Sequence, residues 1–181
     1  MVLNRMEPIH LLDNDDSTTA YTAATPPETI YADLDDLDPL NSDGKITSSV
    51  PWPSQTFLLR SPSTGHLLTL RDGQIILASP GGRGSIHWAC VENKGWLGFR
   101  NTVSGRYLGH DKHGKLHCAA ERQQGWENFC ARITPEGGYI LLMTHFERLW
   151  HVGIKSERGV ERLAKLGDGV VNGMVWEFVK V

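Results

Sequence analysis

Short apolar runs, each about five residues long, recur through residues 56–181 and are separated by turns that contain glycine. The first of them, Thr56–Arg60, is followed by a second run at 66–70 and a third at 74–78. No stretch of the chain shows a convincing helical period. Runs of this length between glycine turns predict an all-β domain.

The runs repeat one plan three times, in units of about 56–95, 96–138 and 139–181. Each unit has three strands and then a strand that begins at or beside a tryptophan. The twelve predicted strands are 56–60, 66–70, 74–78 and 87–91; 96–100, 106–110, 115–119 and 126–130; and 139–143, 148–152, 162–165 and 176–179.

The turns support this division of the chain. Asp72-Gly73 and His113-Gly114 place a glycine where a tight hairpin requires a positive φ angle. The third unit departs from the pattern, because Glu147 stands where the other units have glycine and extra residues occur around 155–160 and 167–173. We therefore expect the loops of the third unit to differ from the others.

Three units of four strands suit a closed barrel with a hairpin cap better than a propeller, which needs about four to eight blades to close. Closure removes the exposed strand edges that promote aggregation. The predicted fold is therefore a β-trefoil built from three four-stranded repeats.

The repeats resemble the trefoils of the fascin and actin-cross-linking superfamily across residues 56–181. The fullest copy consists of Ser104–His110, Gly114–Cys118 and Trp126–Phe129, and fainter copies are Gly65–Leu67 with Trp88 and Arg148–Trp150 with Trp176. The resemblance implies a protein-interaction module, with actin as a candidate partner. Fascin resembles four such trefoils in tandem, whereas this chain has one.

Charge divides the chain into two unlike parts. Residues 1–55 carry ten acids against two bases, whereas residues 56–181 carry 16 bases against 11 acids and most of the aromatic side chains. An acidic segment with so few aromatics does not bury enough apolar surface to fold alone. We predict a disordered acidic segment over 1–55 and an ordered domain from Thr56, after the restricted Pro51-Trp52-Pro53 junction.

The basic domain favours an acidic protein surface as the partner, because opposite charge speeds encounter. The candidate contacts are close together in the second unit: Arg100, Arg106, Lys112, Lys115 and Arg122. The leading hypothesis is a non-catalytic, cytoplasmic interaction module that binds actin or a similar acidic surface and needs no cofactor.

Carbohydrate binding is the alternative hypothesis. Ricin-type lectins mark their repeats with Gln-x-Trp, and Gln124-Gly125-Trp126 matches this motif, although the equivalent positions before Trp88 and Trp176 do not. Nucleic-acid binding ranks lower, because the domain has no localised Lys/Arg run and no evident aromatic platform. No apolar run approaches the roughly 18 residues of a membrane span.

The tryptophans that recur with the repeat, Trp88, Trp126 and Trp176, are predicted to lie in the core. Trp96 and Trp150 occur in predicted strands and are expected to join it. Outside the repeats, Trp52 either holds the linker against the domain or stays exposed.

The sequence offers no recognisable catalytic or metal site. The His110–Cys118 run is rich in ligand atoms, but His117 and Cys118 point to opposite faces of a strand. Gly81–Ser85 lacks the ending of a phosphate-binding loop, and aligning Gly44 with an EF-hand loop leaves both essential ligands missing. The three cysteines, Cys90, Cys118 and Cys130, are interpreted as reduced and buried.

Overall fold

The structure, a computed structural model, describes residues 48–167 and 173–181. These residues form twelve antiparallel β-strands and one short 3₁₀ helix, so the prediction of an all-β domain is confirmed. The predicted acidic segment lies outside the described residues, apart from positions 48–55. In chain order, the elements are β1 (Thr56–Arg60), β2 (Leu67–Arg71), β3 (Gln74–Ala78), β4 (Trp88–Asn93), β5 (Trp96–Asn101), β6 (Tyr107–His110), β7 (Leu116–Ala120), η1 (Gly125–Glu127), β8 (Phe129–Ile133), β9 (Tyr139–His145), β10 (Arg148–Glu157), β11 (Val160–Lys165) and β12 (Val175–Lys180).

Six of the strands pair in a closed ring. Going round, β1 pairs with β4, β4 with β5, β5 with β8, β8 with β9, β9 with β12, and β12 with β1. Every ring strand therefore has a neighbour on both sides. This closure satisfies backbone groups that would otherwise form open sheet edges.

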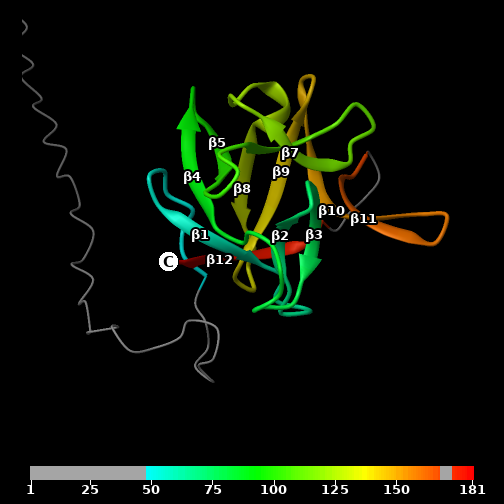
Figure 1. Ribbon diagram of the computed structural model, residues 1–181. Helices are drawn as coiled ribbons and strands as arrows, with labels where there is room; N and C mark the ends of the chain where they lie inside the picture. The colour runs from blue at the N-terminus through cyan, green and yellow to red at the C-terminus, as the bar shows by residue number, and fades with distance from the viewer. Residues whose placement is uncertain (1–47, 168–172) are drawn as a thin grey trace, which may run out of the picture. The chain divides into compact units, whose positions relative to one another are not determined.

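The other six strands form three hairpins, β2–β3, β6–β7 and β10–β11. Each hairpin continues from a ring strand, through the pairs β1–β2, β5–β6 and β9–β10. In Figure 1 the β10–β11 hairpin extends well beyond the strands around it. The extra residues noticed around 155–160 account for this, since β10 is ten residues long and its pairing with β11 continues to Glu157 and Val160.

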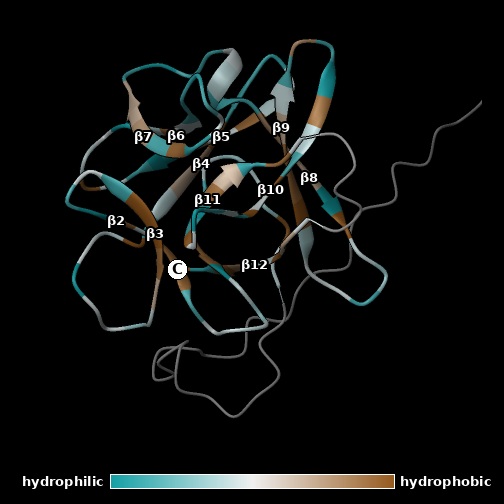
Figure 2. Cartoon of the chain, turned by 90° about the vertical axis from the view of Figure 1, so that its right-hand side faces the viewer, coloured by the Kyte–Doolittle hydropathy of each residue, from teal (hydrophilic) through white to brown (hydrophobic). Residues whose placement is uncertain are grey.

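The core lies inside the ring, where apolar side chains of the ring strands meet. The ring of Phe178 contacts Phe57, Phe99 and Tyr139 at centroid distances of 5.4–5.7 Å. Hydrophobic residues are frequent along the strands and polar residues in the loops between them (Figure 2). This succession of apolar strands and polar loops explains why the ring strands were recognisable from the sequence.

The tryptophan prediction is right at two positions and wrong at the third. Trp88 and Trp176 are fully buried, but Trp126 is 51% exposed. The segment around Trp126 is a 3₁₀ helix instead of the start of a strand, and β8 begins later, at Phe129. A different backbone conformation therefore turns this indole outward, and Phe129 takes its place in the core.

Two further tryptophans also differ from expectation. Trp96 and Trp150 are only half-buried and do not belong to the buried core cluster. Trp52 is 62% exposed, which answers the question left open for it. The chain around it nevertheless contacts the domain, because Ser49 N donates to the carbonyl of Phe178 and Ser54 N to that of Cys90.

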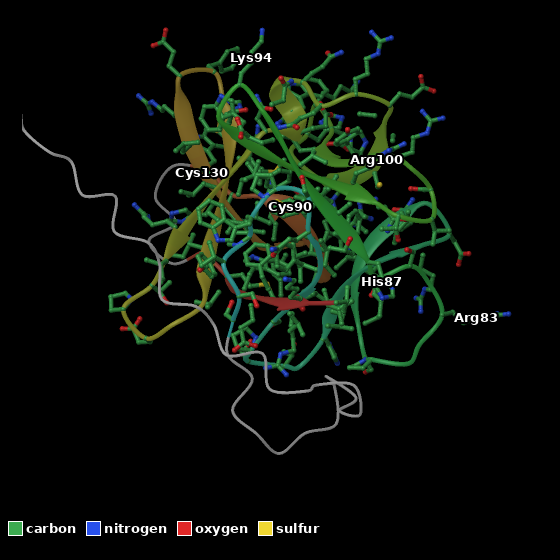
Figure 3. The ribbon with its side chains drawn as sticks, turned by 90° about the vertical axis from the view of Figure 1, so that its left-hand side faces the viewer. Arg83, His87, Cys90, Lys94, Arg100 and Cys130 are labelled. Carbon is green, nitrogen blue, oxygen red and sulfur yellow. The ribbon has the colours of Figure 1, made fainter. Side chains whose placement is uncertain are left out.

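The buried thiol of Cys90 should resist modification in the folded protein. Burial raises its pKa to about 12, and its Sγ lies 3.5 Å from the Pro51 carbonyl oxygen. Figure 3 labels Cys90 among the side chains inside the domain. The thiolate is the reactive form. We expect iodoacetamide at about pH 8 to modify the half-buried Cys130 first and Cys90 only after unfolding, as measured by peptide mass spectrometry. Equal native labelling of both would contradict the burial of Cys90.

Candidate functional site

Five side chains from five different elements form a continuous group, called here the ring–lysine cluster. It consists of Trp126 from η1, His110 from β6, Lys165 from β11, His145 from β9 and Trp150 from β10. The Trp126 and His110 rings stack at 5.1 Å, and the His145 and Trp150 rings lie 3.8 Å apart. The Lys165 ammonium joins the two ring pairs.

Hydrogen bonds hold the Lys165 ammonium between the two ring pairs. Its Nζ lies 3.0 Å from His110 Nε2 and 2.9 Å from His145 Nδ1. The other nitrogen of His110, Nδ1, is 2.8 Å from the carbonyl oxygen of Asp111 and must donate to it. This leaves Nε2 as an acceptor, so His110 is a neutral imidazole that accepts from the lysine.

Burial and charge agree with that assignment. Burial lowers the pKa of His110, and the neighbouring Lys165 ammonium lowers it further. Lys165 is only 7% exposed, and burial lowers its pKa as well. Its Nζ also lies 5.3 Å from the centroid of the Trp150 ring, within the range of a cation–π contact.

Trp126 is held at the surface by the structure beneath it. Glu127 accepts a hydrogen bond from Gln124 N, which closes the short helix on itself, and Thr144 Oγ1 donates to the Gly125 carbonyl. The second of these contacts joins η1 to β9. The indole can therefore be exposed without being loose, since one face rests on the buried His110 ring.

A cleft of about 300 Å³ opens beside the cluster, between the β6–β7 turn and the β10–β11 hairpin. Its described lining is Lys112, His113, Gly114, His145, Trp150, Lys155, Lys165, Leu166 and Gly167. The turn is attached to β11 by a hydrogen bond from Lys165 N to the Gly114 carbonyl. Aromatic walls with a few polar groups are typical of small-molecule sites.

A second hollow, of about 510 Å³, adjoins the first and shares His145 and Trp150 with it. Phe146 lies on its rim, at the tip of the β9–β10 turn, and is 94% exposed. Its φ of +52° is uncommon for an aromatic residue. In this turn the third unit has Glu147 at the position where the first two units have glycine. The sequence therefore indicated correctly that this loop differs from the others.

Three of the five basic residues predicted as contacts are engaged by neighbouring groups. Arg100 donates to the Gly105 carbonyl, Arg106 pairs with Glu121, and Lys115 donates to Gln74. Arg122 lines a separate hollow that includes Glu121 and Glu127. Of the five, only Lys112 lines the 300 Å³ cleft.

Four of the five cluster residues were not singled out as ligand contacts from the sequence. His145, Trp150 and Lys165 come from the third unit, whose repeat is the least regular. Two features of the sequence could have indicated a site there: the irregularity of the third repeat, and Lys165 directly after the apolar pair Leu163-Ala164. The fifth, Trp126, was noticed through Gln-x-Trp but assigned to the core.

No group of three or more potential metal ligands occurs in the described part of the chain. Within the run that looked rich in ligands, His110 is occupied by Lys165 and the Asp111 carbonyl. Cys118 Sγ lies near the Arg106 carbonyl. Also among the described residues, no helix is long and apolar enough to cross a membrane.

Comparison with known proteins shows similarity in structure only. No protein-family model and no curated protein matches the chain. An exo-β-1,3-galactanase from Clostridium thermocellum matches with a TM-score of 0.58 and 18% identity, over 71% of this chain and 30% of the enzyme. An endo-β-galactosidase from Clostridium perfringens that releases GlcNAcα1-4Gal matches with a TM-score of 0.55 and 12% identity, over 70% of this chain and 32% of the enzyme.

A designed threefold-symmetric protein, ThreeFoil, matches as well. Its TM-score is 0.54 at 14% identity, over 70% of this chain and 99% of the designed protein. The chain thus spans about a third of the matched enzymes but nearly all of the designed domain. At these identities the matches speak for the fold alone.

These matches correct three predictions. The expected relation to the fascin superfamily is contradicted, because the similar structures described above are glycoside hydrolases and a designed protein. Actin binding by a protein-interaction module loses its basis with that relation. The prediction that the chain is no enzyme is also contradicted, since the natural proteins it resembles here are enzymes that act on carbohydrate.

Proposed function

We propose that residues 56–181 form a β-trefoil and that the ring–lysine cluster binds carbohydrate. The closed ring of six strands with three hairpins supports this architecture. The match over almost the whole length of a designed threefold protein supports it as well. Carbohydrate was the alternative hypothesis from the sequence, and it agrees with the similar structures better than a protein partner does.

The observation that carries the proposal is the exposed indole of Trp126, supported from behind by the His110 ring. A pyranose presents a flat patch of C–H groups, which packs well on the face of an aromatic ring. A rigidly held ring loses little conformational entropy when a sugar docks on it. Trp126 therefore provides a ready surface for one sugar ring.

The cleft supplies the polar half of such a site. Lys112 and Lys155 lie along it and can donate to sugar hydroxyls, while the Trp150 and His145 rings form a wall. A few polar groups among aromatic rings are what orientation-specific binding requires. Trp126 and the cleft are linked through His110 and Lys165, so an oligosaccharide is a better fit than a single sugar.

Galactosides are the first ligands to test. Three natural proteins of similar structure are an endo-β-galactosidase, a β-1,3-galactosidase and an exo-β-1,3-galactanase. All three are named for galactose-containing substrates. We take β-1,3-linked galactose oligosaccharides as the proposed ligand class.

Replacing Trp126 by alanine should weaken binding of β-1,3-galactobiose to the full chain by roughly tenfold or more, because a central aromatic contact commonly dominates a small interface. Isothermal titration calorimetry measures this effect. Trp52→Ala is the matched control, since Trp52 is also an exposed tryptophan (62%) and lies outside the cluster. We expect it to bind like the unaltered chain.

Two results would count against the proposal. If the unaltered chain binds no galactoside at millimolar concentration, the ligand class is wrong. If Trp126→Ala and Trp52→Ala bind equally well, Trp126 is not the sugar platform. Circular dichroism of both variants ensures that a loss of binding does not reflect unfolding.

A further inference from the structure

Lys165 is a buried cation for which the described residues provide no carboxylate. Its ammonium contacts two imidazole nitrogens and faces an indole ring, and His110 accepts from it as a neutral imidazole. An ammonium has three N–H donors, and these contacts use two of them. Burying a charge without an opposite charge is unfavourable, so the position favours a ligand that brings one.

The other charges along the cleft have the same sign. Lys112 and Lys155 line it together with Lys165, and no acidic side chain does so among the described lining residues. Lys112 is exposed and forms no ion pair within the described ranges. Lys155 pairs with Glu157 at 2.7 Å, but both side chains are about half exposed, where such pairs are weak.

Two acidic residues next to the cleft, among those that the structure describes, are already engaged. Asp111 Oδ1 accepts hydrogen bonds from the backbone N–H groups of His113 and Lys115, which close the β6–β7 turn. Asp111 and Glu157 line the neighbouring hollow, not this one. The described lining therefore offers donors and positive charge to a ligand in the cleft.

We propose that this cleft binds the anionic substituent of a galactoside, either a sulfate ester or a carboxylate, with Lys165 at its inner end and Lys112 at its mouth. The inference rests on the proposed carbohydrate function and specifies its ligand. Charge-assisted hydrogen bonds to such a group are stronger than those to a hydroxyl, and more so in a partly buried cleft. The neutral sugar rings would pack on Trp126, and the anion would select among galactosides.

The experiment compares four probes on the full chain by calorimetry at low salt. They are neutral β-1,3-galactobiose, the same disaccharide carrying a 6-sulfate, an aldobiouronic acid containing glucuronate linked to galactose, and inorganic sulfate alone. We expect at least one anionic disaccharide to bind roughly tenfold more tightly than the neutral one, with the preference falling as salt screens the charges. Comparison of the two anionic sugars identifies the preferred source of the charge.

Two lysine variants test the assignment. Lys112→Gln removes an exposed charge and should reduce the preference for the anionic sugar severalfold without affecting the fold. Lys165→Met should abolish the preference for the anionic sugar; because Lys165 belongs to the proposed site, binding of neutral galactobiose to the same variant is measured as the reference. Lys94→Gln is the matched control, because Lys94 lies at the β4–β5 turn on the face shown in Figure 3 and does not line the cleft.

Each outcome decides between the two proposals. Equal binding of neutral and anionic disaccharides, unchanged by Lys112→Gln, overturns the anion inference and leaves carbohydrate binding intact. Absence of binding by all three disaccharides overturns the proposed function itself. If inorganic sulfate binds as tightly as the sulfated sugar, the cleft is a plain anion site and the galactoside inference is wrong.

Discussion

Replacing Trp88 by alanine should destabilise the domain by about 4–5 kcal/mol, the upper part of the range for truncating a buried aromatic residue. Trp88 is fully buried, and its Nε1 donates to the Leu68 carbonyl at 2.9 Å. The substitution leaves a large cavity in the core and removes the partner of that carbonyl. A loss of this size is a large part of the 5–15 kcal/mol that typically holds a domain folded.

Trp126→Ala is the matched comparison, because both tryptophans occupy the same point of the repeat in the sequence. Since Trp126 is half exposed, its loss should cost about 1 kcal/mol or less. Urea unfolding followed by fluorescence and circular dichroism measures both variants. Similar losses for the two would show that Trp126 belongs to the core, as the repeat alone predicts, and would remove the platform from the proposed site.

Replacing Gly84 by alanine should cost about 3 kcal/mol or more, through backbone strain and a steric clash together. Its φ is +121°, and an added Cβ would lie 2.6 Å from Thr69 Cγ2 and 2.8 Å from the Leu70 carbonyl oxygen. The loop has no room to move away, because Leu70 and Ser85 exchange two backbone hydrogen bonds beside it.

Gly81→Ala is the control for backbone conformation alone. Gly81 has a φ of +75° in the same loop, but an added Cβ would have no atom within 4 Å. We expect a cost of about 1 kcal/mol there. Thermal unfolding of both variants distinguishes strain from clash, and a Gly84→Ala variant as stable as Gly81→Ala would contradict the close approach of this loop to β2.

The ring strands were predictable as short apolar runs between glycine turns, and two of them also alternate. In β4 and β12, Trp88, Cys90, Trp176 and Phe178 are buried at alternate positions. Such a pattern depends only on local geometry, since successive residues of a strand point to opposite faces. The Asp72-Gly73 turn was predictable for the same local reason, and both residues have positive φ angles, of 50° and 75°.

The position of Trp126 could not be derived from the repeat. The second unit matches the repeat most fully, yet its segment around Trp126 is a 3₁₀ turn. Two hydrogen bonds between Gln124 and Glu127 and one from Thr144 to the Gly125 carbonyl hold this turn. Two of these contacts are local, but the third comes from a strand nearly 20 residues away. Whether an indole points inward depends on such contacts, which a repeat pattern does not contain.

The sequence by itself determined the all-β class, most of the strands and the irregularity of the third unit. Only the tertiary structure brought His110, His145 and Lys165 together. The physical reason is that strand patterning reflects burial of neighbouring residues, whereas a binding site depends on where distant strands meet. In this protein, Lys165 lies 55 residues from His110 along the chain, and their nitrogens are 3.0 Å apart because β11 packs beside the turn that follows β6.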